Sequence, residues 1–187
     1  SAYGNCPNII FETFNEPEHQ DWSTVIKPYH QALVSSIRTK SQNLVLLGSR
    51  QWNQRLDEVA NDPLDSTRYT NIAYSVHFYA ATHKQWNRDM VQQAIDKNLP
   101  VFASECGLSE ANGNGSIDER EFNAWVDFLE SNSIGWVVWG VDDKEESSAA
   151  LKPGASPNGG WVASRDLTPG GLAAYNLIRS KQGDKVL

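Results

Sequence analysis

Two glutamates that stand at the ends of apolar, β-rich runs are the residues of this chain best placed to carry chemistry. Glu16 lies in an Asn-Glu-Pro tripeptide directly after the run 8–14, and Glu105 ends the run 100–105. A pair of carboxyl groups on either side of a glycosidic bond can hydrolyse it. One carboxyl must be protonated to give its proton to the leaving oxygen, and the other must be ionised to attack the anomeric carbon. The two residues are far apart in the sequence, so this chemistry requires a fold that brings strand ends together.

Three further polar or aromatic residues stand in or near the ends of predicted strands, namely His77, Tyr79 and Trp139. Each of these features also has a structural interpretation. An Asn-Glu-Pro turn can serve only to cap a helix, a glutamate at a strand end can simply be solvated, and a histidine, tyrosine or tryptophan can belong to the core. The occurrence of all of them at strand ends favours a shared site over these separate interpretations.

The hydrophobic pattern predicts strands and helices in strict alternation. The predicted strands cover residues 8–14, 44–48, 72–79, 100–105 and 134–140. The predicted helices cover 23–37 with Ser23 or Thr24 as the cap, a short segment around Leu56 and Val59, 86–97, 118–131 and 171–180, and a long loop covers 142–169. Continuous apolar strands alternating with amphipathic helices are typical of a parallel sheet covered by helices.

Such a sheet could be doubly wound or part of a barrel. No glycine-rich phosphate turn follows any predicted strand, which disfavours a dinucleotide-binding fold. In a (β/α)8 barrel, the carboxyl ends of the strands converge on one mouth, where Glu16 and Glu105 would face each other.

Composition and charge exclude several classes of partner. The net charge is −7, whereas nucleic acids and anionic membranes require basic patches on the proteins that bind them. No apolar run approaches the length of a transmembrane helix. Seven Trp and six Tyr are enough for both a core and some platforms for sugar rings. No His/Cys/Asp cluster has metal-ligand spacing, so we expect neither a metal nor an organic cofactor.

Five stretches of the sequence resemble glycoside hydrolase family 5, in particular its bacterial-type cellulase subfamily. They are NIIFETFNEPE, IKPYHQALVSSIR, VHFYAATHK, PVFASECGLSEANGNG and WVVWGVDDKEESSAALKPGASPNGGW. Together they span almost the whole chain and are far more specific than one tripeptide. The resemblance implies an α/β fold of the (β/α)8 TIM-barrel type, a secreted endo-β-1,4-glucanase (cellulase), and hydrolysis with retention of anomeric configuration.

The resemblance also implies roles for the residues at the reacting sugar. Glu16 would be the acid/base and Glu105 the nucleophile, with their carboxyl groups about 5–5.5 Å apart. Asn15 would bind the 2-hydroxyl of the reacting sugar. Tyr79 would hydrogen-bond and orient Glu105, and His77 would sit beside the pair.

Further binding residues are implied on either side of the bond that is cleaved. Trp139 would stack under the sugar on the non-reducing side, and Lys144 and Glu146 would bind hydroxyls one sugar further out. Trp52 resembles a platform on the leaving-group side. The substrate would be β-1,4-glucan, as cellulose or cello-oligosaccharides.

One departure from the family concerns the number of βα units. In the family the Asn-Glu-Pro strand is the fourth of eight, whereas here it begins at Asn8, and the chain is shorter than the roughly 250 residues of a whole barrel. We therefore expect residues 1–187 to be the C-terminal portion of a single catalytic barrel that lacks the first three units. The missing units would include an arginine and a histidine that tune the catalytic pair in the family. Such a chain should pair with a complementary N-terminal fragment or with itself.

Two alternatives remain open at the level of the sequence. The chain could be a non-catalytic half-barrel that binds glucan, or it could perform the same chemistry on mannan or mixed-linkage β-glucan.

Barrel geometry also predicts that Cys6, before the first strand, and Cys106, after the fourth, are free thiols. The two residues would lie at opposite ends of the strands, and a strand is about 20 Å long. The Cα atoms of a disulfide must lie within about 7 Å of each other.

Overall fold

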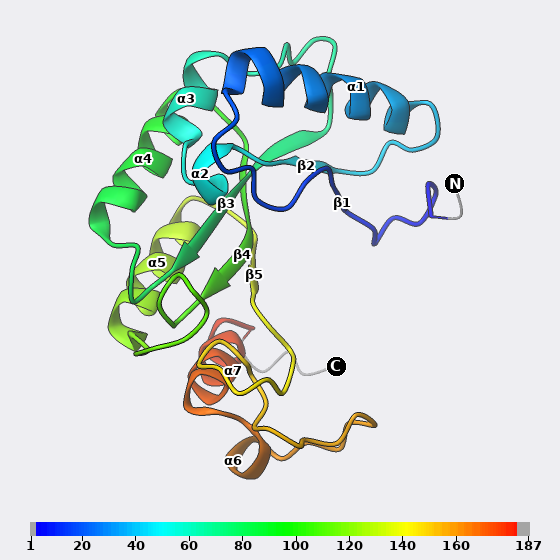
Figure 1. Cartoon of the computed structure of the whole chain (residues 1–187). Helices are drawn as coiled ribbons and strands as arrows, with labels where there is room; N and C mark the ends of the chain where they lie inside the picture. Colours follow the sequence, from blue (N-terminus) through cyan, green and yellow to red (C-terminus); the bar gives the residue numbers. More distant parts are fainter. Residues whose placement is uncertain (1–2, 183–187) are drawn as a thin grey trace. The chain divides into compact units, whose positions relative to one another are not determined.

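A computed structural model describes residues 3–182 of the chain, in which strands and helices alternate (Figure 1). The strands are β1 Phe11–Glu12, β2 Val45–Leu47, β3 Ile72–Tyr79, β4 Val101–Gly107 and β5 Trp136–Val138. The helices are α1 Lys27–Arg38, preceded by a π-helical turn at Trp22–Ile26, then α2 Arg50–Asn53, α3 Leu56–Asn61, α4 Gln85–Asp96, α5 Glu119–Ser131, α6 Ala163–Asp166 and α7 Pro169–Gln182.

The strand order distinguishes between the two folds that the alternation allows. Among the described residues the sheet has the order β1-β2-β3-β4-β5, and the β1–β2 and β2–β3 pairs are parallel. The Tyr74 amide donates to the Pro100 carbonyl and the Ala80 amide to the Gly107 carbonyl, which continues the parallel register. Each strand thus lies beside its sequence neighbour with no reversal of order, as in a barrel and not as in a doubly wound sheet. The predicted fold class, a (β/α)8 barrel of which five βα units are present, is confirmed.

The described chain divides into two compact units. The first contains the chain up to His77 together with Gln85–Ser104, and the second contains Phe78–Lys84 and the chain from Glu105 onward. Strands β3 and β4 therefore contribute residues to both units.

The first unit has a core of aliphatic side chains. Val45 and Leu47 on β2 are fully buried, as are Val34 on α1 and Leu56 on α3. Helices α3 and α4 pack side by side (Figure 1). Burying each such side chain contributes about 1.5–3 kcal/mol of hydrophobic free energy.

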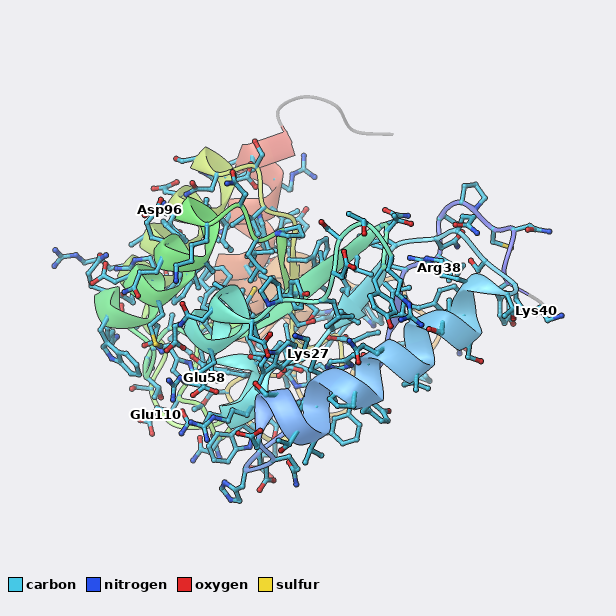
Figure 2. All side chains as sticks on the ribbon, turned by 90° about the horizontal axis from the view of Figure 1, so that it is seen from above. Lys27, Arg38, Lys40, Glu58, Asp96 and Glu110 are labelled. Atoms are coloured by element: carbon cyan, nitrogen blue, oxygen red, sulfur yellow. The ribbon has the colours of Figure 1, made fainter. Side chains whose placement is uncertain are left out.

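Helix α1 is tied at its C-terminal end to the loops that enter β2 and β3. Arg38 lies near the end of α1 (Figure 2). Its guanidinium donates to the backbone carbonyls of Asn43 and Asn71 at 2.9 and 2.8 Å. A cation at the end of a helix also interacts favourably with the helix dipole. Arg38 thus fixes the point at which both strands begin.

The second unit has an aromatic core. The Phe78 ring stacks on Trp125 with ring centroids 4.1 Å apart, and Phe122 lies 6.0 Å from Phe78. Trp125, Val126 and Leu129 on α5 are fully buried, as the spacing of apolar residues in this helix predicts. This packing anchors the end of β3, where Tyr79 follows Phe78.

Several predicted boundaries differ from the structure. The predicted strand 72–79 is found unchanged, but β1, β2 and β5 are shorter than predicted, although Thr13 and Trp139 beside them still donate backbone hydrogen bonds to Leu46 and Cys106. Helices α2 and α6 were not predicted, since four residues are too few to show a helical period. The predicted cap of the first helical segment is also wrong: Asp21, and not Ser23 or Thr24, accepts a hydrogen bond from the Thr24 amide.

Both cysteines of the described chain are free, as predicted. Cys106 lies within β4 and not after it, and its thiol donates to the Val137 carbonyl at 3.3 Å. Burial, and secondarily the charge of Glu105, raise the pKa of this thiol. Within residues 3–182, no helix is both long enough and apolar enough to cross a membrane.

Candidate active site

In the first unit, the carboxyl group of Glu16 lies against the ring of His77. Glu16 follows β1, and its side chain is one quarter exposed, whereas His77 near the end of β3 is buried. The distance from His77 Nδ1 to Glu16 Oε1 is 2.7 Å, which is a hydrogen bond between the ring and the carboxyl group. The end of one strand and the interior of another thus bring together two residues singled out from the sequence.

The other side of the His77 ring contacts residues that the sequence did not single out. Its Nε2 lies 3.0 Å from Asn53 Nδ2 and 2.9 Å from Ser104 Oγ. The hydroxyls of Ser75 and Ser104 both donate to Glu12 Oε1, at 2.7 and 2.8 Å. Ser75 could have been found from the sequence, because it stands two residues from His77 on β3 and therefore on the same face.

Asn15 and Trp52 lie on the surface of the first unit. The Asn15 side chain is exposed, and its backbone carbonyl accepts a hydrogen bond from Asn53 Nδ2 at 2.7 Å. The Trp52 side chain is 47% exposed and meets the His19 ring edge-on, with centroids 6.2 Å apart. Because a large indole face remains accessible, it can still serve as a platform for a sugar ring.

In the second unit, Tyr79 holds the carboxyl group of Glu105. The Tyr79 hydroxyl donates to Glu105 Oε1 at 2.7 Å. The close approach requires Gly107, since a Cβ atom at that position would lie 2.7 Å from two carbons of the Tyr79 ring. The hydroxyl therefore orients the carboxyl group of Glu105.

Trp139, Lys144 and Glu146 form a second group in this unit. Trp139 is 45% exposed, and Lys144 Nζ lies 5.9 Å from the centroid of its indole ring. Lys144 Nζ is 3.7 Å from Glu146 Oε1, which also accepts a hydrogen bond from the Ser148 hydroxyl at 3.0 Å. Lys144 and Glu146 line a cavity of about 430 Å³. An aromatic face beside hydrogen-bonding charged groups is suited to a sugar ring with its hydroxyls.

Comparison with known proteins supports the resemblance. The family model described as cellulase (glycosyl hydrolase family 5) matches residues 1–145. An endoglucanase of Clostridium saccharobutylicum is 44% identical over 94% of this chain and 39% of its own length. Endoglucanase Z of Dickeya dadantii is 37% identical over 95% of this chain and 39% of its own length.

Solved structures agree with these relatives. A structure from Cytophaga hutchinsonii has a TM-score of 0.93 and 40% identity, covering 97% of this chain and 59% of that chain. The catalytic domain of Thermobifida fusca endoglucanase Cel5A has a TM-score of 0.86 and 28% identity, covering 97% of this chain and 60% of that domain chain. This chain thus spans well under two thirds of the proteins that it matches. Its fold, its strand-end residues and these matches together show that it belongs to glycosyl hydrolase family 5.

Proposed function

We propose that this chain carries the two catalytic carboxyl groups of a retaining endo-β-1,4-glucanase, with Glu16 as the acid/base and Glu105 as the nucleophile. The observation that supports this most directly is that each carboxyl group has its own hydrogen-bond donor from β3. His77 contacts Glu16 and Tyr79 contacts Glu105. The names of its relatives, endoglucanases, supply the reaction class.

The reaction has two displacements. In the first, the Glu105 carboxylate attacks the anomeric carbon while Glu16 transfers its proton to the glycosidic oxygen, so that this bond breaks and a covalent glycosyl ester forms. In the second, the Glu16 carboxylate takes a proton from water, the resulting hydroxyl attacks the same carbon, and Glu105 leaves as a carboxylate. Two inversions leave the configuration of the anomeric carbon unchanged. The two displacements together consume only water, so we expect no metal or organic cofactor.

The remaining site residues have binding roles in this proposal. Trp139 stacks under the sugar on the non-reducing side, and Lys144 and Glu146 bind hydroxyls of the next sugar. Asn15 binds the 2-hydroxyl of the reacting sugar. Trp52 offers a platform on the leaving-group side. A polymeric glucan is too large to enter a cell, so the protein is proposed to act after secretion.

We also propose that residues 1–187 are the C-terminal portion of one catalytic barrel and are completed by further βα units. The relatives are longer than this chain, and β1 is the end strand of the described sheet. An apolar pocket of about 260 Å³ beside β1 is lined by Phe14, Val25 and Tyr29, which are 51%, 50% and 41% exposed. Side chains of a preceding βα unit would bury this pocket.

Reducing-sugar release tests these proposals. The chain is assayed on carboxymethylcellulose alone and after mixing with a separately expressed three-unit fragment of a family 5 relative. The Glu105→Gln variant serves as the control, because its amide is nearly isosteric but cannot act as the nucleophile. We expect activity to rise on mixing and to be absent in the variant. Binding without hydrolysis in every mixture would instead indicate a glucan-binding module, and preference for mannan or mixed-linkage glucan in a substrate panel would change the substrate class.

A further inference from the structure

The segment Arg50–Asn53 adopts a backbone conformation that is unusual for its residues. Gln51, Trp52 and Asn53 all have positive φ angles, of 53°, 54° and 61°. Residues other than glycine are seldom found in this left-handed region, because their Cβ atoms crowd the backbone there. Three in succession persist only where surrounding contacts impose them. The contacts of Asn53, which is fully buried, show what this backbone achieves.

Two backbone groups settle the orientation of the Asn53 amide. The Ser49 backbone N–H donates to Asn53 Oδ1 at 2.8 Å, and Asn53 Nδ2 donates to the Asn15 carbonyl at 2.7 Å. An N–H can only donate and a carbonyl can only accept, so both contacts require the same orientation. Gly48 permits the approach, because a Cβ atom there would lie 2.7 Å from Asn53 Oδ1.

The second hydrogen of Asn53 Nδ2 determines which nitrogen of His77 carries a proton. Nδ2 lies 3.0 Å from His77 Nε2, and one of its two hydrogens is already committed to Asn15. The other hydrogen faces Nε2 and finds an acceptor there only if Nε2 presents a lone pair. A neutral imidazole with a lone pair on Nε2 has its hydrogen on Nδ1, and Nδ1 is the atom 2.7 Å from Glu16 Oε1.

Ser104 and Glu12 act on Nε2 in the opposite direction to Asn53. Ser104 Oγ lies 2.9 Å from Nε2 and 2.8 Å from Glu12 Oε1 but has one hydrogen to donate. A carboxylate is the stronger acceptor, so Ser104 donates to Glu12 and turns an oxygen lone pair toward Nε2, which favours a hydrogen on that nitrogen. Glu12 Oε1 is 3.9 Å from Nε2, which is beyond hydrogen-bond distance, although its charge alone would favour a cationic ring. Asn53 opposes both influences, because an N–H at Nε2 would point directly at its own.

We propose that Asn53 is a positioning residue: it holds His77 as the neutral tautomer with the hydrogen on Nδ1 and so directs a neutral N–H donor at Glu16. Gln54 supports His77 through the His77 backbone. The Gln54 side chain donates a hydrogen bond to the His77 carbonyl and accepts one from Asn87. The tautomer of His77 is independent of the proposed function, and only its consequence for Glu16 as the acid rests on that function. A neutral donor orients Glu16 without the full charge of an imidazolium, which would hold the carboxylate ionised and oppose its role as an acid.

Nitrogen-15 NMR of the whole chain tests the proposal without requiring activity. A long-range proton–nitrogen correlation spectrum at neutral pH distinguishes the two neutral tautomers of each histidine from the cation. The chain has four histidines, and the signals of His77 are those lost in His77→Gln. We expect a protonated Nδ1 and an unprotonated Nε2. A cationic ring, or a hydrogen on Nε2, in the unmodified chain would overturn the proposal even if no variant folded.

Two variants then test the role of Asn53. Asn53→Asp is nearly isosteric and keeps an acceptor for the Ser49 amide, but it replaces the donor that faces Nε2 with an acceptor. We expect Nε2 of His77 to become protonated in this variant. Gln54→Met, the matched control from the adjacent position, removes contacts to the His77 backbone and should leave the tautomer unchanged. An unchanged His77 pattern in Asn53→Asp, or the same change in both variants, would contradict the proposal. Because these spectra do not depend on hydrolysis, an inactive chain with the expected tautomer would count against the proposed function alone.

Discussion

At the scale of single residues, the two proposed catalytic glutamates differ in the donors that their carboxyl groups receive. Glu105 accepts a hydroxyl hydrogen from Tyr79, and Glu16 accepts a ring N–H from His77. Tyr79 and His77 stand two residues apart on β3, so one strand supplies both donors. The proposed nucleophile is thus held by a phenol hydroxyl, and the tautomer of His77 decides whether the proposed acid/base also faces a neutral group.

The acid/base role of Glu16 predicts how a variant depends on the leaving group. In the active form of the protein, Glu16→Gln should slow cleavage of unactivated glucan by about a hundredfold or more, which is the usual contribution of general acid catalysis. With a dinitrophenyl cellobioside, whose leaving group needs no proton, the first displacement should be nearly unchanged. The rates of product release on the two substrates measure the difference. Equal losses on both would show that Glu16 is not the acid.

His30 should make the stability of the chain sensitive to pH. The residue is fully buried, and its ring contacts Thr13 Oγ1 and the Gly48 carbonyl. Burial lowers its pKa from 6.5 to about 4. The unfolded chain then takes up a proton first as the pH falls, so this contribution to stability is present above pH 6.5 and is lost progressively toward pH 4.

The expected size of this loss is about 3 kcal/mol between pH 7 and pH 4. Urea unfolding at a series of pH values measures it, and a His30→Gln variant should show a flatter profile over the same range. His19, whose side chain is 79% exposed, provides the control. A His19→Gln variant should follow the unmodified chain, and a His30→Gln profile of the same slope as the unmodified chain would show that burial of His30 is not the cause.

At the scale of elements, Asp118 links the start of α5 to the loop after β3. It accepts a hydrogen bond from the Glu121 amide at 2.9 Å, and it pairs with Lys84 at 2.6 Å. The bond from Lys84 holds the pKa of this carboxyl below its usual value. Helix α5 in turn carries Trp125, which stacks on Phe78 next to Tyr79.

Removing this cap should destabilise the second unit. We expect Asp118→Ala to lower the free energy of unfolding by about 1 kcal/mol, because the Glu121 amide loses its acceptor. Asp118→Asn keeps the cap and removes only the charge, so it should cost less, since more than a third of this ion pair is exposed to solvent. Urea unfolding monitored by tryptophan fluorescence compares the two. Equal losses would attribute the effect to the ion pair and not to the cap.

At the scale of the whole molecule, the two end strands of the described sheet leave apolar side chains exposed. Ile10 and Phe14 flank β1 and are 48% and 51% exposed, and Val137 on β5 is 51% exposed. An unpaired strand edge with apolar side chains is a template for association. We therefore predict that the chain by itself does not persist as a monomer.

Light scattering at micromolar concentration measures the oligomeric state. We expect self-association that is reduced when complementary βα units are added, because both would occupy the same strand edges. The substitution Phe14→Ser, which removes an exposed ring beside β1, should weaken self-association with little change in circular dichroism. A stable monomer with native-like near-ultraviolet circular dichroism would contradict the prediction.

Local features of the sequence determined the alternation of elements, the parallel sheet and the strand ends at which Glu16 and Glu105 stand. These follow from periodicity and turn chemistry, which act over a few residues. The β3 strand at 72–79 was predicted to the residue; six of its eight residues are apolar or aromatic, and the polar Asn71 precedes it. The family motifs then assigned roles that periodicity alone could not.

Only the tertiary structure decided which groups surround those carboxyls. Asn53 reaches His77 and Asn15 across 24 and 38 residues of sequence, through a left-handed turn that no local propensity favours. Glu12 receives its hydrogen bond from Ser104 across 92 residues. Such contacts depend on strand register and on the close approach that Gly48 allows, and both are properties of the packed chain. The physical reason is that hydrogen bonds between distant residues are specified only once the sheet has set the distances between them.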